Sequence, residues 1–145
     1  MPVEKVFLFF ANPNNLPRIK LAAPPMRPGI ANRDGLAGVS SEIVTSFRLF
    51  PFLPLRAQWI ALITEFEWNH HFADIQKKGP FKRFRHRHEM SAEMRDGVTG
   101  TVVRDNIEYD AGFGVLGDVA NKLFIAPSLR KTFEYRQKML EKLLG

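Results

Sequence analysis

The stretch Gly79–His88 reads GPFKRFRHRH, and its alternation predicts a β-strand that begins just after a Gly-Pro turn. Successive side chains of a strand point to opposite faces. One face of this strand therefore carries Phe84, His86, His88 and Met90. The other face carries the charged residues Arg83, Arg85, Arg87 and Glu89. Arginine is rarely buried unless it is paired, so we expect the arginine face to be solvated and the histidine face to be the inner one.

Length and composition limit the classes of protein to consider. The 145 residues predict one domain, spanning 1–145, that buries a core without disulfides. The chain has no cysteine, which excludes thiol catalysis and thiolate zinc sites. The apolar run VFLFF at Val6–Phe10 is too short to span a membrane and lacks a small-residue cleavage site. We therefore expect a soluble, cytoplasmic protein.

The positive charge of the chain has two interpretations. A net charge of +6 and a pI near 9.9 favour contact with an anionic partner such as nucleic acid or an anionic membrane. The basic residues are also spread along the chain, and arginines on a solvated strand face commonly pair with Glu and Asp across the sheet. On this second interpretation, nucleic-acid binding is not expected.

The order of elements predicts an α+β fold. Val3–Phe10 and Asn14–Lys20 are expected to form two short helices on either side of a turn rich in capping residues. Residues 22–38 are rich in Pro and Gly and allow at most a short edge strand near Ile30. Strand patterns then follow at Val39–Leu49, Leu55–Glu65, His71–Gln76, Phe81–Met94 and Thr101–Tyr109. The sequence therefore predicts an antiparallel sheet of about six strands.

The C-terminal part of the chain changes to a helical period. Asp118 is expected to cap a helix that is interrupted at Ala126-Pro127. A long amphipathic helix is expected at Ser128–Leu144, with one stripe formed by Leu129, Thr132, Phe133, Arg136, Leu140 and Leu143. If this stripe faces the sheet, Arg136 must reach water or a carboxylate.

Several segments in this order resemble the START-like, or SRPBCC, superfamily, and within it the polyketide-cyclase-like bacterial ligand-binding proteins. The resemblance runs almost from end to end. Its segments are FFANPNNLPRI at Phe9–Ile19, Trp59 with Ile63, FADIQKKGPFKRFRHRH at Phe72–His88, GTVVRDNIEY at Gly100–Tyr109 and FEYRQKML at Phe133–Leu140. The order and spacing are specific for the fold and only weakly specific for the activity.

The resemblance implies a helix-grip fold, in which a curved sheet wraps around the long C-terminal helix and leaves an elongated cavity. Members of the superfamily usually bind a lipid, polyketide, sterol or isoprenoid there, which implies a small hydrophobic ligand and no cofactor. The ligand-binding residues expected on this basis are Trp59, Phe72, Phe84, His86, His88, Asp105, Tyr109, Phe133 and Arg136.

The chain differs from the superfamily pattern at its start. Members begin with a β-strand before the first short helix, whereas Met1 and Pro2 lead directly into the first helix here. We expect that this strand is missing, through loss or a misassigned start. The last strand would then expose an unpaired edge, which favours a homodimer or coverage by irregular chain.

The inner polar residues allow three kinds of chemistry. His86 and His88 with Asp105 have the composition of a two-histidine, one-carboxylate metal site, but His70 and His71 lie near a turn and supply no firm third histidine, so no metal is expected. The same residues could perform acid/base catalysis of the cyclase or dehydratase kind. In the third alternative they hydrogen-bond with Tyr109 and water and orient the polar end of a ligand, which is the function expected here.

The segment FPFLPL at Phe50–Leu55 is expected to form an apolar hairpin tip. It either folds over the cavity mouth or packs on the N-terminal helices, and its flanking residues Arg48 and Arg56 leave peripheral membrane contact as an alternative.

Overall fold

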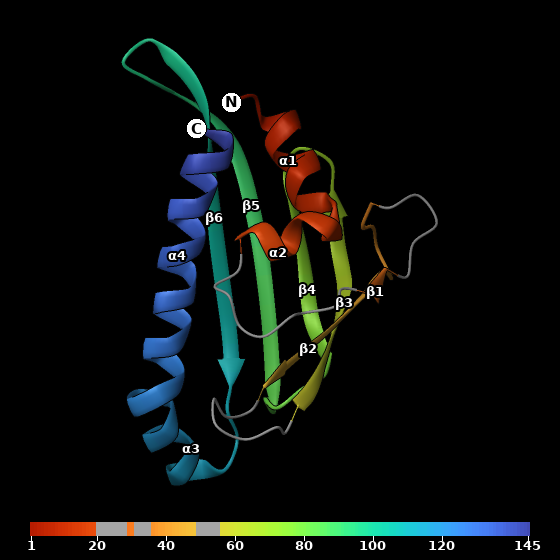
Figure 1. Cartoon of the computed structure of the whole chain (residues 1–145), viewed down its shortest axis with the longest axis vertical. Helices are drawn as coiled ribbons and strands as arrows, with labels where there is room; N and C mark the ends of the chain where they lie inside the picture. Colours follow the sequence, from red (N-terminus) through yellow and green to blue (C-terminus); the bar gives the residue numbers. More distant parts are fainter. Residues whose placement is uncertain (20–28, 31–35, 49–55) are drawn as a thin grey trace.

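The computed structural model describes residues 1–19, 29–30, 36–48 and 56–145. It is an α+β structure in which an antiparallel sheet packs against a long C-terminal helix, as the sequence predicts (Figure 1). The predicted hairpin tip at Phe50–Leu55 and most of the Pro- and Gly-rich segment lie outside the described residues. Within the described residues, no helix combines the length and the apolar character that crossing a bilayer requires.

The sheet follows the order of the chain, and each strand pairs antiparallel with the next. Its strands are β1 (Gly29–Ile30), β2 (Glu42–Arg48), β3 (Arg56–Glu67), β4 (His71–Lys78), β5 (Arg83–Arg95) and β6 (Val98–Asp110). The first of them has only two residues, whereas the other five have seven or more. Every connection between paired neighbours is therefore local in sequence.

The alternation in β5 is confirmed. Phe84, His86, His88 and Met90 are all buried. The residues between them are more exposed, because they point to the opposite face of the sheet. The register places Asp105 directly opposite His88 and Asp74 directly opposite His86. These pairings bring two carboxylates to the two inner histidines.

The N-terminal helices cover one end of the inner face (Figure 1). The helix α1 (Val3–Ala11) is followed by a 3₁₀ turn, η1 (Pro13–Asn15), and by the single-turn helix α2 (Leu16–Ile19). Phe7 of α1 is fully buried, and its ring packs edge-on against Phe66 and Phe72, with ring centroids 5.3 and 5.9 Å apart. This aromatic contact fixes α1 against the sheet beside the histidines.

The C-terminal helix is longer than the sequence pattern predicts. The helix α3 (Gly114–Ala120) continues through a π-helical turn, η2 (Asn121–Ile125), into α4 (Ala126–Leu144). The prediction that Asp118 caps this helix is wrong, because Asp118 lies inside α3 and the N-cap position is Phe113, with a φ of 62°. Pro127 lies in the first turn of α4, where a missing N–H costs little. The interruption expected at the proline is therefore a π-turn just before it.

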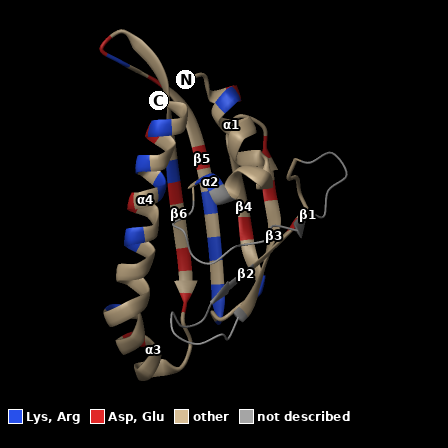
Figure 2. Cartoon of the chain, in the orientation of Figure 1, with Lys and Arg blue, Asp and Glu red and all other residues tan. Residues whose placement is uncertain are grey.

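The outer face of the sheet carries paired charges, and Figure 2 shows basic and acidic residues along neighbouring strands. Arg85 and Arg87 lie 2.8 and 3.4 Å from the carboxylate oxygens of Glu65. Arg87 also lies 2.9 Å from Glu89. The arginine face is thus a solvated surface with cross-strand ion pairs, the second of the two interpretations of the charge.

Candidate functional site

A cavity of about 260 Å³ lies between the inner face of the sheet, α4 and the N-terminal helical segments. Most of its lining is apolar. The lining residues are Phe9, Phe10, Asn12, Pro13, Asn15, Leu16, Ile19, Ile43, Thr45, Trp59, Ala61, Phe72, Asp74, Phe81, Phe84, His86, His88, Leu129, Thr132, Phe133 and Arg136. This volume has room for a small organic molecule or the head of a larger one.

The structure brings most of the predicted site residues together around this cavity. Those that line it are Trp59, Phe72, Phe84, His86, His88, Phe133 and Arg136. Asp105 and Tyr109 were also predicted there, but neither is part of the lining. Asp105 lies behind the two histidines, and Tyr109 donates its hydroxyl to Asn121 at the π-turn instead.

The aromatic end of the cavity is built by Trp59, Phe81 and Phe84. The ring of Trp59 packs edge-on against Phe84, with centroids 4.8 Å apart, and against Phe81 at 5.8 Å. Phe81 is held by the side-chain amide of Gln76, which donates to its carbonyl at 2.7 Å and accepts from its N–H at 3.1 Å. The Gly-Pro turn is thereby locked to β4, and Phe81 is fixed in the cavity wall. Phe81 was not among the site residues predicted from the sequence.

The polar end is organised around one carboxylate oxygen. Oδ1 of Asp105 lies 3.0 Å from Nε2 of His86 and 2.7 Å from Nδ1 of His88. An ionised carboxylate only accepts hydrogen bonds, so both ring nitrogens donate to it. The remaining nitrogens, Nδ1 of His86 and Nε2 of His88, are left for other partners. Asp105 therefore acts from behind the lining and sets the orientation of both imidazoles.

Burial and neighbouring charges set the protonation states of His88 and Asp105 at the polar end of the cavity. Burial lowers the pKa of His88 to about 3, and the nearby charges of His86 and Arg136 add to this effect. His88 is thus neutral at neutral pH. For Asp105, burial alone would raise the pKa, but hydrogen bonds from His86 and His88 and the charge of Arg136 outweigh it and lower the pKa. The structure therefore holds a carboxylate beneath a neutral His88.

Arg136 reaches the polar end from α4, as the helical stripe predicts. Its guanidinium carbon lies 5.0 Å from the ring centroid of Phe10 and 5.6 Å from that of Phe133. Its Nη2 lies 3.9 Å from Asp105 and 3.4 Å from Nδ1 of His88. Burial lowers the pKa of Arg136, whereas Asp105 and Asp74 oppose this shift, and arginine stays charged because its ordinary pKa is far above neutrality. The expected carboxylate partner of Arg136 is thus found.

One donor of Arg136 lacks an acceptor within the part of the chain that the structure describes. Nε of Arg136 is buried and has no hydrogen-bond partner among the described residues. The residue as a whole is only 7% exposed. A buried donor that is not satisfied costs about 1 to 3 kcal/mol, so an acceptor at this position would stabilise the site.

Asp74 is a site residue that was not predicted from the sequence. It lines the cavity, and its Oδ2 lies 4.0 Å from Nε2 of His88. The alternation of the strand could have predicted it, because Phe72 was assigned to the inner face and Asp74, two residues later, returns to the same face. Asp74, His86 and His88 thus form a group of three potential ligand atoms at the cavity wall.

Comparison with solved structures shows that this fold occurs elsewhere. The chain is similar to the crystal structure of TTHA0849 from Thermus thermophilus, with a TM-score of 0.68. The similarity covers 97% of this chain and 88% of that chain, at 15% sequence identity. No protein-family model matches the sequence, and no curated protein matches it. At this identity the likeness is one of fold, and the function must be argued from the site itself.

Proposed function

We propose that the protein binds a small hydrophobic or amphipathic molecule, of the lipid, polyketide or isoprenoid type, in the cavity between the sheet and α4. The START-like resemblance and its helix-grip fold support this proposal, as does the position of the cavity. Aromatic side chains at one end suit an apolar body, and the group around His88 suits a polar head.

The observation that carries the proposal is a mostly apolar cavity whose wall includes the buried guanidinium of Arg136, with an Nε that has no hydrogen-bond partner among the described residues. Buried polar groups in folded proteins nearly always have a partner. A small shift of the Arg136 side chain would let a carbonyl or hydroxyl oxygen of a bound molecule accept a hydrogen bond from its guanidinium, which would remove the cost of leaving a donor without an acceptor. A purely apolar ligand has no acceptor and would leave this donor without a partner.

The donors and acceptors of the polar end restrict the head group further. Arg136 donates, whereas Nε2 of His88 and the carboxylate of Asp74 lie at the wall as acceptors. Two carboxylates, Asp74 and Asp105, face a single guanidinium. A further full negative charge is therefore disfavoured, because like charges repel strongly in a buried site. We infer a neutral head that both accepts and donates, such as a hydroxyl next to a carbonyl.

Native mass spectrometry of freshly purified protein tests the binding proposal. The wild type is expected to carry a co-purified small molecule. Ala61→Met fills the cavity, because Ala61 is buried in its lining, and is expected to lose that molecule. Ala92→Met makes the same change at an exposed position of β5 and is expected to retain it. Equal occupancy in the two variants would contradict binding in this cavity.

Acid/base catalysis in the same cavity is a second candidate. The observation in its favour is a carboxylate that orients imidazoles from behind, an arrangement that also serves general bases. His88 itself is a weak base, because its pKa is lowered to about 3. Proton transfer would thus fall to His86 or Asp74. If the released molecule is returned to ligand-free protein, a change with time in its mass, or in its chromatographic retention at constant mass, indicates an enzyme, and an unchanged molecule indicates a carrier.

Contact with an anionic membrane or nucleic acid is the third candidate. The pairing of Arg85 and Arg87 with Glu65 weakens the case for nucleic acid. An exposed apolar patch supports membrane contact, and it comprises Phe113, Val115, Leu116, Val119, Leu123 and Phe124. Flotation with anionic vesicles tests this alternative, and Leu116→Asp is expected to abolish flotation if the patch binds. A homodimer through the edge of β6 also stays a prediction, which light scattering of the purified protein tests.

A further inference from the structure

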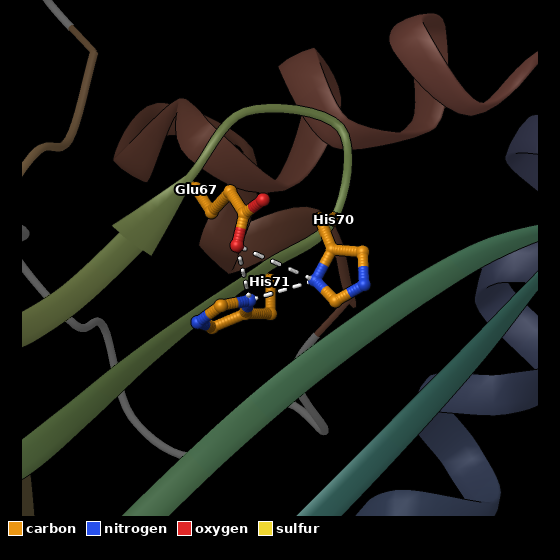
Figure 3. Close-up of side chains that lie close together, drawn as sticks. All are labelled: Glu67, His70 and His71. Carbon is orange, nitrogen blue, oxygen red and sulfur yellow. Dashed lines mark hydrogen bonds and ion pairs between the residues drawn. The ribbon is translucent and has the colours of Figure 1, made fainter.

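A second group of histidine and carboxylate side chains lies away from the cavity, at the turn between β3 and β4. It consists of Glu67, His70 and His71, and Figure 3 shows the three side chains converging. The side chains of Glu67 and His70 are each 64% exposed, whereas that of His71 is 14% exposed. The group is therefore accessible to an ion from solvent.

The distances within this group are close to those between the ligands of one metal ion. Nδ1 of His70 lies 2.8 Å from Nδ1 of His71. Oε2 of Glu67 lies 3.8 Å from the first nitrogen and 3.5 Å from the second. Bonds of about 2.0 to 2.1 Å to a tetrahedral or octahedral ion place neighbouring ligand atoms roughly 3 to 3.4 Å apart. Shifts of a few tenths of an ångström would thus suffice to bind an ion.

One pair in the buried group at the cavity is spaced slightly more widely than any pair at the turn. Nε2 of His88 and Oδ2 of Asp74 are 4.0 Å apart, close to the maximum of about 4.2 Å that two opposite bonds to one ion can span. A water or an amino group, which can donate to both acceptors, bridges the same distance with hydrogen bonds of about 2.8 Å. This spacing suits a hydrogen-bonded group in the cavity.

The turn holds its ligands in place through the backbone. The N–H of His70 donates to the carbonyl of Glu67 at 3.1 Å, and the N–H of Met90 donates to the carbonyl of His70 at 2.7 Å. These bonds tie the turn to itself and to β5. Oε2 of Glu65 lies 3.6 Å from Nε2 of His71, on the side of the ring away from the group. A carboxylate in that position favours the tautomer whose Nδ1 is free to bind a metal.

We propose that Glu67, His70 and His71 form a binding site for a divalent transition-metal ion such as Zn²⁺. Nδ1 of each histidine and the carboxylate of Glu67 are the protein ligands, and water completes the coordination. Imidazole and carboxylate donors suit zinc and its neighbours. The bound ion would clamp the turn between β3 and β4, which leads directly into Phe72 and Asp74 of the cavity. The proposal does not depend on ligand binding in that cavity.

Zinc titration of the untagged full chain tests this proposal. The chain has four histidines, so imidazole NMR signals can report on each of them. The signals of His70 and His71 are expected to move to saturation at one equivalent of Zn²⁺, while those of His86 and His88 stay in place. Zinc is also expected to raise the melting temperature, because it binds the folded state.

Variants separate this site from adventitious binding. His70→Ala and Glu67→Gln are each expected to weaken zinc binding by roughly tenfold or more and to abolish the thermal shift. Glu108→Gln, which makes the same change at another exposed glutamate, is expected to bind zinc like the wild type. Zinc-induced shifts at His86 and His88 would overturn the proposal, as would unchanged affinity in His70→Ala or the absence of saturation in the wild type.

Discussion

The imidazoles of His86 and His88 share a single oxygen of Asp105, at 3.0 and 2.7 Å. This arrangement follows from strand pairing, because β6 places Asp105 directly opposite His88 and His86 lies two residues earlier on β5. One carboxylate thus orients two side chains of the cavity wall without lining the cavity itself. The stability of the protein should therefore depend on the negative charge of Asp105.

The first prediction concerns Asp105→Asn, which removes the charge and replaces an acceptor with a donor. The free energy of unfolding is expected to fall by about 2 kcal/mol or more, because two buried histidine N–H groups lose a charged acceptor. Urea denaturation measures this loss. Asp118→Asn, at an exposed position of α3, is the matched control and should change stability by less than about 0.5 kcal/mol. Equal effects of the two variants would contradict the role given to Asp105.

The second prediction concerns acid sensitivity. His88 has a folded pKa of about 3 against an ordinary value of 6.5, so the unfolded state binds its proton first as the pH falls. The contribution of His88 to the free energy of unfolding is therefore fully present above pH 6.5 and decreases as the pH falls toward 3. The decrease is at most about 1.4 kcal/mol per pH unit. Urea denaturation between pH 6.5 and 4.5 measures this slope.

The control for this slope is His88→Gln, which has no titrating group at that position and should show a flatter dependence. The lowered pKa values of Glu65 and Glu93 affect stability only below about 4.5, outside this range. A wild-type stability that is constant from pH 6.5 to 4.5 would contradict the burial of a neutral His88.

The third prediction links α4 to His88. The guanidinium of Arg136 contributes to the lowered pKa of His88, so Arg136→Met is expected to raise that pKa. It should remain below 6.5, because burial is the larger cause of the shift. Titration of the His88 imidazole by NMR measures the change. Arg130→Met alters an exposed arginine of the same helix and should leave the pKa of His88 where it is.

The fourth prediction concerns the turn before β5. A Cβ at Gly79 would overlap the side-chain amide of Gln76, which makes two hydrogen bonds to Phe81. Gly79→Ala is therefore expected to displace Gln76 and to cost about 1 to 2 kcal/mol. Gly100→Ala meets nothing within 4 Å and is the matched control. In a double-mutant cycle Gly79→Ala should add little to Gln76→Ala, and full additivity would show that the two residues act independently.

Part of the site could be predicted because strand and helix periods are local properties of a sequence. Alternation in β5 identified the inner face with His86 and His88, and the helical stripe identified Phe133 and Arg136. The same rule applied to β4 would have found Asp74 from Phe72. These residues depend only on which side of their own element they occupy.

Other features depend on how separate elements meet. Register and packing decide that Asp105 lies behind the histidines and that Tyr109 bonds with Asn121. The bond between Gln76 and Phe81 and the meeting of Glu67 with His70 and His71 depend on turn conformation. No period of one segment encodes such contacts, because they form only when neighbouring strands and turns fix their relative positions.

The sequence by itself thus determined the α+β class, the long C-terminal helix and the inner face of β5, since hydrophobic and polar residues recur with the period of each element. Tertiary structure alone decided which carboxylate holds the histidines, which one lines the cavity and which donor of Arg136 lacks a partner among the described residues. The physical reason is that hydrogen bonds of about 3 Å require relative positions of elements that only the packed fold specifies.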